Sequence, residues 1–273
     1  MKKNKINNFT IFGSKGFFGS NLVNYLKKNK NKVFTPNKKK FIFKKNLGNV
    51  IYCTGTHQAS INPGKALDGN LNILSKVLLN NKFQTFTYLS SIRVYSSNKK
   101  TNEEANIILD KNEKDLYFKT LKLAAENLCL QSNNPQVKIV RISNIFGPYF
   151  KNQKYLLPSL IRNTRRKKRI LITINKNTKK NYLHVDDAIR VILQIIFKGK
   201  KQLYNVASDE MISINNIIKL IKKEYKINVY FNKKGKNKSE NKINISRIKN
   251  EFNFKPVYKF KNEINKIIKD FKI

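Results

Sequence analysis

This 273-residue sequence has no tryptophan, two histidines and two cysteines. Cys53 and Cys129 form no CxxC pair and each lies in an apolar run, so we expect buried thiols in a reducing compartment rather than a disulfide or a metal site. No apolar run reaches the roughly 18 to 20 residues that a membrane helix needs. The basic N-terminus resembles the start of a signal peptide, but residues 13–15 interrupt its apolar segment. We therefore expect a cytoplasmic protein with no bound metal and no membrane partner.

Acidic residues are also scarce, because 16 Asp and Glu stand against 57 Lys and Arg, a formal net charge of +41. Such a charge ordinarily suggests nucleic acid or an anionic membrane as a partner. Here the excess is mostly Lys, spread along the whole chain, without an Arg-rich arm or an aromatic-interleaved basic stripe. A compositional bias explains this better than a specific nucleic-acid partner does. A polyanion-binding role stays open, and its test is whether binding survives physiological salt.

Short apolar runs alternate with helix-like segments over the first half of the chain. NNFTIFG, NVIYCTG, FTYLSS and VKIVRIS are the runs, and they predict a parallel sheet with helices on both faces, the α/β class. After Gly147 the alternation stops, and the later helices and one short strand predict a small C-terminal substrate-binding lobe. We place a dinucleotide-binding domain at residues 1–148, joined by 179–206, and the lobe at 149–178 and 207–273.

A glycine triplet, Gly13, Gly16 and Gly19, lies directly between the first predicted strand and the first predicted helix. Glycines there permit a tight turn and close approach of a pyrophosphate, which the N–H groups and dipole of the helix N-terminus stabilise. The spacing of three and three differs from the GxGxxG of ordinary dinucleotide dehydrogenases. The triplet predicts a dinucleotide site at the start of the chain.

Several further segments occur in an order that resembles the extended short-chain dehydrogenase/reductase family, which contains nucleotide-sugar epimerases and dehydratases. They are YLSSIRVY, LKLAAE, VRISNIFGP, KNYLHVDD and YNVAS, and with the glycine loop they run from Thr10 to about Pro256. The resemblance implies a Rossmann-type doubly wound sheet, NAD or NADP as cofactor, and a nucleotide-activated sugar as substrate. It implies transient hydride transfer to the cofactor while a tyrosine acts as acid/base.

The resemblance also assigns residues. The catalytic set is Ser91, Tyr117 and Lys122. The cofactor-binding set is Gly13, Lys15, Gly16, Phe17, Phe18, Gly19, Asn37, Thr54, Gly55 and Lys122. The substrate-binding set is Ser91, Arg93, Asn144 and Lys180.

The spacing of Tyr117 and Lys122 departs from the family pattern, in which the two residues are four apart. On a regular helix, positions five apart are offset by about 140° and do not share a face. A π-bulge would return both to one face, or the helix begins late and Tyr117 approaches from the preceding loop. In the third interpretation the pair is broken and Phe118 points at the site.

Other choices stay open at this level. Asn37, followed by three lysines, lies where family members distinguish NAD from NADP, and NAD is slightly favoured. Ile92 and Arg93 replace the acidic pair usual in dehydratases of the family, which favours epimerisation or simple oxidoreduction. An NADP-dependent carbonyl reductase and a non-catalytic dinucleotide-binding protein are the alternatives. Apolar helix faces suit either a homodimer or burial within one subunit.

Overall fold

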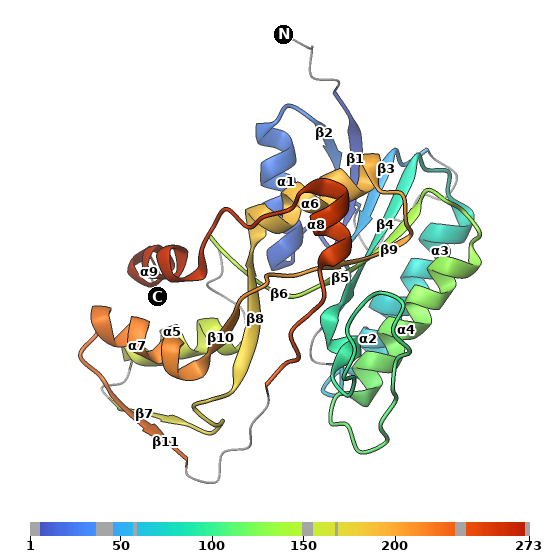
Figure 1. The fold of residues 1–273 in the computed structure, drawn as a ribbon. Coiled ribbons are helices and arrows are strands. Elements are labelled where there is room, and N and C mark those ends of the chain that lie inside the picture. Colours follow the sequence, from blue (N-terminus) through green and yellow to red (C-terminus); the bar gives the residue numbers. More distant parts are fainter. Residues whose placement is uncertain are drawn as a thin grey trace.

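The structure, a computed structural model, describes residues 6–36, 46–56, 59–148, 155–166, 169–232 and 239–270. Its centre is a six-stranded parallel sheet with the strand order β2-β1-β3-β4-β5-β9 (Figure 1). These strands are β1 (Asn8–Phe12), β2 (Lys32–Phe34), β3 (Asn49–Tyr52), β4 (Thr85–Ser91), β5 (Val137–Ile142) and β9 (Leu203–Val206). The order reverses between β1 and β3, and crevices at such a reversal are where open α/β sheets bind ligands. The predicted doubly wound Rossmann-type fold is confirmed.

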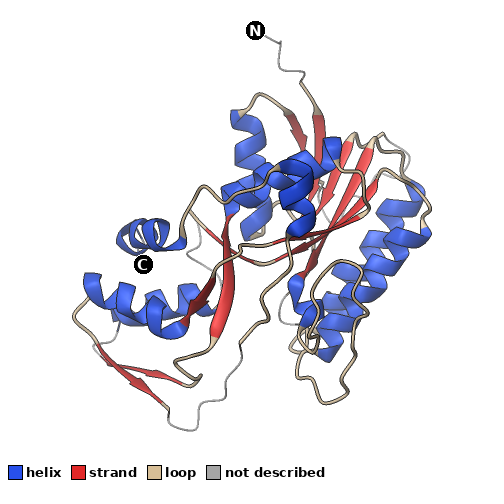
Figure 2. Cartoon of the chain, in the orientation of Figure 1, coloured by secondary structure: helices blue, strands red, loops and turns tan. Residues whose placement is uncertain are grey.

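Helices cover both faces of this sheet (Figures 1 and 2). α1 (Phe17–Lys28) packs against α6 (Val185–Lys198) on one face, and α3 (Ile73–Asn80) packs against α4 (Leu116–Gln131) on the other. α2 (Pro63–Leu67) and a π-helical turn, η1 (Asp68–Asn72), precede α3. β3 and β4 are buried almost throughout, as strands covered on both faces must be. Their near-continuous apolar runs follow from that double burial.

A second region beside the carboxyl edge of the sheet carries two smaller sheets. β6 (Asn144–Phe146), β8 (Lys179–His184) and β10 (Met211–Ser213) form one, and β7 (Arg169–Ile172) pairs with β11 (Asn228–Phe231) in the other. Its helices are α5 (Leu156–Arg166), α7 (Ile214–Glu224) and α9 (Phe260–Asp270). Among the described helices none is long and apolar enough to span a membrane.

The chain crosses between the two regions more often than the alternation indicated. In the segment 179–206, expected to return to the dinucleotide-binding domain, the first strand, β8, pairs with β6, which lies within residues 1–148, and with β10, which lies in the expected lobe. β9 joins the six-stranded sheet, and α6 packs against it. In contrast, α8 (Ser246–Phe252), expected in the lobe, packs against α6 and β9. Strand pairing between distant segments, which local periodicity does not encode, decides these placements.

Candidate active site

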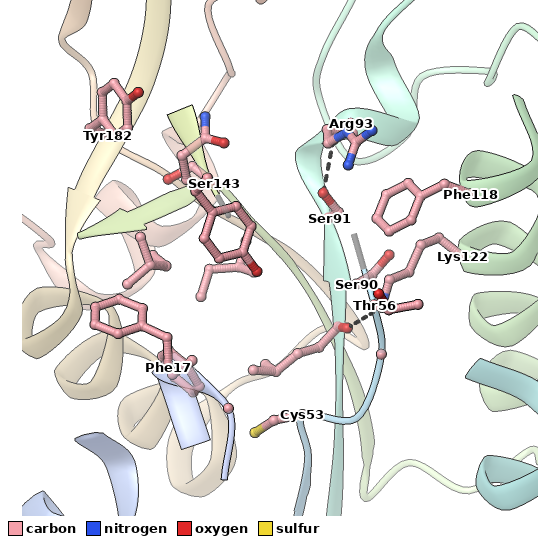
Figure 3. A pocket seen from close by; sticks show the side chains of 18 of the residues that line it. Phe17, Cys53, Thr56, Ser90, Ser91, Arg93, Phe118, Lys122, Ser143 and Tyr182 are labelled. Atoms are coloured by element: carbon pink, nitrogen blue, oxygen red, sulfur yellow. Dashed lines mark hydrogen bonds between the residues drawn. The ribbon is translucent and has the colours of Figure 1, made fainter. Parts of the chain in front are cut away.

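A pocket of about 540 Å³ opens where the glycine loop, the carboxyl ends of β3, β4 and β5, and the second region meet (Figure 3). Eleven of the predicted site residues line it: Gly16, Phe17, Phe18, Gly19, Thr54, Gly55, Ser91, Arg93, Lys122, Asn144 and Lys180. Gly13, Lys15 and Tyr117 are not among the lining residues, and Asn37 lies outside the described residues. The fold therefore brings most of the predicted cofactor and substrate residues to one cavity.

The glycine loop forms one end of the pocket. Gly13 has φ +82°, and a Cβ there would lie 2.8 Å from the backbone carbonyl of Cys53, so a larger residue would push β1 away from β3. A Cβ on Gly19 would collide with the Gly13 backbone. The Gly16 N–H donates to the Gly13 oxygen at 2.9 Å, and α1 then begins without a side-chain cap or an acidic first turn. This leaves the positive end of the helix dipole for an anionic ligand.

Lys122 projects from α4 into the centre of the pocket (Figure 3). Its ammonium group donates to the Tyr88 hydroxyl at 3.1 Å and to the Leu89 carbonyl at 2.9 Å. Its residue exposure is 6%. Burial lowers the pKa of Lys122 to about 8, and the nearby Glu126 carboxylate opposes this shift. With this pKa, part of the Lys122 population is neutral near pH 8.

Phe118, not Tyr117, shares this face of α4. The helix is α-helical from Leu116 to Gln131, so the predicted π-bulge and the predicted late helix start are both wrong. Phe118 lines the pocket four residues before Lys122. Tyr117 is 39% exposed, and its hydroxyl donates to the Pro63 carbonyl at 3.0 Å. The predicted acid/base role of Tyr117 does not fit this placement.

Ser91 and Arg93 follow directly from β4 at the edge of the pocket. The Ser91 hydroxyl accepts the backbone N–H of Arg93 at 3.2 Å and begins the short 3₁₀ turn η2 (Ile92–Tyr95). The Arg93 guanidinium lies 4.2 Å from the centre of the Phe118 ring and forms an ion pair with Asp115. A second cation, the Lys122 ammonium, lies 6.0 Å from the centre of the same ring.

A carboxylate that the sequence did not single out occupies the end of the pocket formed by Asn144 and Lys180. Glu240 accepts hydrogen bonds from the Asn144 amide at 2.8 and 3.0 Å and from the Lys180 ammonium at 3.1 Å. The backbone N–H of Asn181 donates to it at 2.9 Å. Asn144 and Lys180, predicted as contacts for substrate phosphate, are thus already held by an anionic side chain. No local signal marks Glu240, which is a single acid in a Lys- and Asn-rich segment.

Other lining residues were also missed by sequence reasoning, namely Cys53, Thr56, Ser90, Asp115, Ser143, Tyr155 and Tyr182. Two of them are phenols from the second region. Burial raises the pKa of both, and for Tyr155 the Arg93 charge opposes the increase. Tyr155 and Tyr182 come from segments whose position depends on long-range packing, and the resemblance assigned them no role.

A buried network supports the floor of the site. The Arg141 guanidinium binds the Glu126 carboxylate through Nε at 3.0 and 3.2 Å and through an Nη atom at 2.6 Å. Glu126 also accepts the Ser90 hydroxyl, and Arg141 donates to the Tyr95 hydroxyl at 2.6 Å. Both charged side chains are about 95% buried. The network ties α4 to β4 and β5, which keeps Lys122 and Ser91 in fixed positions relative to each other.

The profile of the NAD dependent epimerase/dehydratase family matches residues 43–207, more than half of the chain. The chain belongs to this family.

Solved structures of similar fold cover nearly the whole chain. UDP-N-acetylglucosamine 4-epimerase from Methanobrevibacter ruminantium, in complex with UDP-N-acetylmuramic acid, is 18% identical, with a TM-score of 0.83 over 98% of this chain and 99% of that one. RMD from Pseudomonas aeruginosa, complexed with NADPH, is 21% identical, with a TM-score of 0.78 over 97% and 99%.

A third similar structure is a tyrosine-to-phenylalanine mutant of UDP-glucuronic acid 4-epimerase from Bacillus cereus, in complex with UDP-4-deoxy-4-fluoro-glucuronic acid and NAD. It is 17% identical, with a TM-score of 0.77 over 97% of this chain and 99% of that one. No curated protein matches the sequence. At these identities the solved structures establish the fold, and they show that proteins of this fold hold NAD or NADPH.

Proposed function

We propose that this family member binds NAD and a nucleotide-activated sugar side by side, and that it epimerises the sugar by transient hydride transfer. One observation carries the proposal: a single pocket joins the glycine loop, Lys122, Ser91 and the Asn144–Lys180 end. The dinucleotide and the sugar must lie next to each other in such a reaction, because the hydride moves directly between them.

The cofactor end fits a dinucleotide. Gly13 and Gly19 keep the turn free of side chains, so the N-terminus of α1 can approach a pyrophosphate. A Cβ on Gly55 would lie 3.5 Å from the Lys122 ammonium, so the bare backbone leaves room for a ribose that Lys122 and Thr54 would bind. When bound, NAD would supply the hydride acceptor and later return the hydride. NADP remains an alternative, since the segment expected to distinguish the two lies outside the described residues.

The substrate end offers donors for a sugar nucleotide. Ser91 would orient the reacting sugar oxygen, while Arg93, Asn144 and Lys180 would contact the rest of the ligand. Because Glu240 accepts hydrogen bonds from both Asn144 and Lys180, phosphates must share these donors or displace the carboxylate. Lys180 acts there as a point charge without the bidentate geometry of arginine.

The proton step requires a group other than Tyr117, because that side chain is outside the pocket. Lys122, with a pKa of about 8, has a neutral fraction near physiological pH and would accept the proton of the sugar hydroxyl, directly or through Ser91. Without a phenol at position 118 we expect slow turnover. A Tyr→Phe variant of an epimerase of this fold is in complex with a UDP-sugar and NAD.

A non-catalytic dinucleotide-binding protein is the second candidate function. Phe118 on the pocket face of α4 favours it, because the ring carries no proton to exchange. This candidate predicts affinity for NAD without any change in a bound sugar.

The test is an NMR-monitored incubation with UDP-, GDP- and dTDP-sugars and catalytic NAD or NADP, run for wild type, Lys122→Met and Tyr117→Phe. We expect the wild type to epimerise one of the sugars. Lys122→Met should abolish this activity, and Tyr117→Phe should leave it unchanged. Intact sugars despite measurable NAD binding would favour the non-catalytic candidate. Stoichiometric consumption of the reduced cofactor would instead identify a reductase.

A further inference from the structure

Ser143 is a buried pocket residue that the proposal above leaves without a role. It follows β5 directly, and its backbone N–H donates to the Val206 carbonyl at 3.0 Å, which fixes its position against β9. Its residue exposure is 7%, and it lines the pocket. Figure 3 shows it on the opposite side of the pocket from Phe118 and Lys122.

The Ser143 hydroxyl has no hydrogen-bond partner within the described part of the chain. Buried hydroxyl groups nearly always have a hydrogen-bond partner, because a hydroxyl that is removed from water and left without one destabilises the folded protein. Thr87, on β4, also has an unpaired hydroxyl, but it is fully buried and does not line the pocket. The difference is that Ser143 belongs to the pocket lining, where rotation about its Cα–Cβ bond can turn the hydroxyl, itself buried in the ligand-free protein, toward a ligand.

The position of Ser143 indicates which part of a ligand it meets. In the register of β4 and β5, Ile142 is the partner of Ser91, so Ser143 lies one residue beyond the serine expected to orient the reacting oxygen. Asn144, at the substrate end, is the next residue along the chain. The glycine loop, in contrast, follows β1, which β3 and β4 separate from β5. Ser143 therefore belongs to the sugar side of the pocket.

We propose that Ser143 is a sugar-binding residue whose hydroxyl forms a hydrogen bond with a hydroxyl of the hexose ring. This rests on the proposed function. A serine hydroxyl donates and accepts, as a sugar hydroxyl does, and no cation adjoins it in sequence to favour a phosphate instead. The free protein carries an unmet hydrogen bond that the bound sugar satisfies, so the residue contributes to affinity at the expense of stability.

Ser143→Ala tests this with two measurements. Thermal unfolding of the ligand-free variant should occur at the same or a higher temperature than in wild type, because the substitution removes an unsatisfied group. Calorimetric titration should show affinity for a UDP-hexose weakened about tenfold, with affinity for UDP alone and for NAD unchanged. Thr87→Val is the matched control: it removes the second buried hydroxyl that has no partner among the described residues, and it should leave all three affinities unchanged.

The outcomes separate the two proposals. If wild type binds UDP-hexose and Ser143→Ala binds it equally well, or if the ligand-free variant is markedly less stable, the role of Ser143 is refuted while the proposed function stands. If wild type binds NAD but none of the UDP-, GDP- or dTDP-sugars, the proposed function fails, and the role of Ser143 fails with it. If Ser143→Ala loses the same affinity for UDP as for UDP-hexose, Ser143 contacts the nucleotide, and its assignment to the sugar is overturned.

Discussion

Replacing Phe118 by tyrosine should create the acid/base pair that this pocket lacks. Phe118 is four residues before Lys122, and both side chains line the pocket from a regular stretch of α4. The added hydroxyl extends a ring whose centre is 4.2 Å from the Arg93 guanidinium carbon and 6.0 Å from the Lys122 nitrogen. The new phenol would therefore lie near two cations.

The size of the effect follows from these distances. At an effective dielectric constant of about 20, a unit charge about 5 Å away stabilises a phenolate by about 3 kcal/mol, or about 2 pKa units. Asp115 cancels part of the Arg93 charge, and the field of the two cations that is left opposes the burial that raises the pKa of a phenol, so we expect the pKa of the new tyrosine to lie near or below its usual value of about 10. A positioned acid/base of this kind contributes about 100-fold to 10,000-fold in rate.

The assay is epimerisation followed by NMR, with ultraviolet difference titration of the variant against wild type to measure the new phenol. We expect Phe118→Tyr to raise turnover at least about 100-fold, and Phe118→Tyr combined with Lys122→Met to lose that gain. Tyr117→Phe serves as the control that removes a phenol outside the pocket. Unchanged turnover in Phe118→Tyr with intact NAD affinity, or loss of activity in Tyr117→Phe, would refute the assignment of the two positions.

Three further predictions concern the surrounding charges. Lys122 has its pKa lowered to about 8 in the folded protein, so between about pH 8 and 10.5 only the unfolded state keeps the proton. The unfolding free energy of wild type relative to Lys122→Met should therefore rise by about 3 kcal/mol across that window in pH-dependent urea titrations, and a flat difference would show that the ammonium is not buried. Glu126→Gln should destabilise the protein by about 3 to 5 kcal/mol in urea unfolding, because Arg141 loses its buried partner. A loss below about 1 kcal/mol would mean that solvent reaches this pair. Glu240→Gln should tighten nucleotide-sugar binding roughly fivefold by calorimetry, since about 1 kcal/mol of competition for Lys180 is removed; weaker binding would mean that the carboxylate organises the site instead of competing for it.

The first half of the fold was predictable because its signals are local. Alternating apolar runs and helical segments indicate buried parallel strands. β1, β3 and β5 lie within the predicted runs, and β4 begins one residue before its run, at Thr85. The glycine triplet predicted the turn at Gly13, where a side chain would meet the neighbouring strand. In contrast, β6 and β10 are only three residues long and pair with β8. The residues that pair between β6 and β8 are 38 positions apart along the chain, so no short window of sequence contains both partners.

The sequence by itself determined the class of sheet, the residue types available for chemistry and their order along the chain. Tertiary structure decided which of them meet. The choice between Tyr117 and Phe118 depends on the phase of α4, which is set by where the helix begins and by its packing against β4 and β5. Glu240 reaches Asn144 across 96 residues of chain, and Ser143 acquires an unmet hydrogen bond only when β5 is buried. Partners and burial arise from contacts between distant segments, and for that reason only the folded chain shows which side chains the pocket uses.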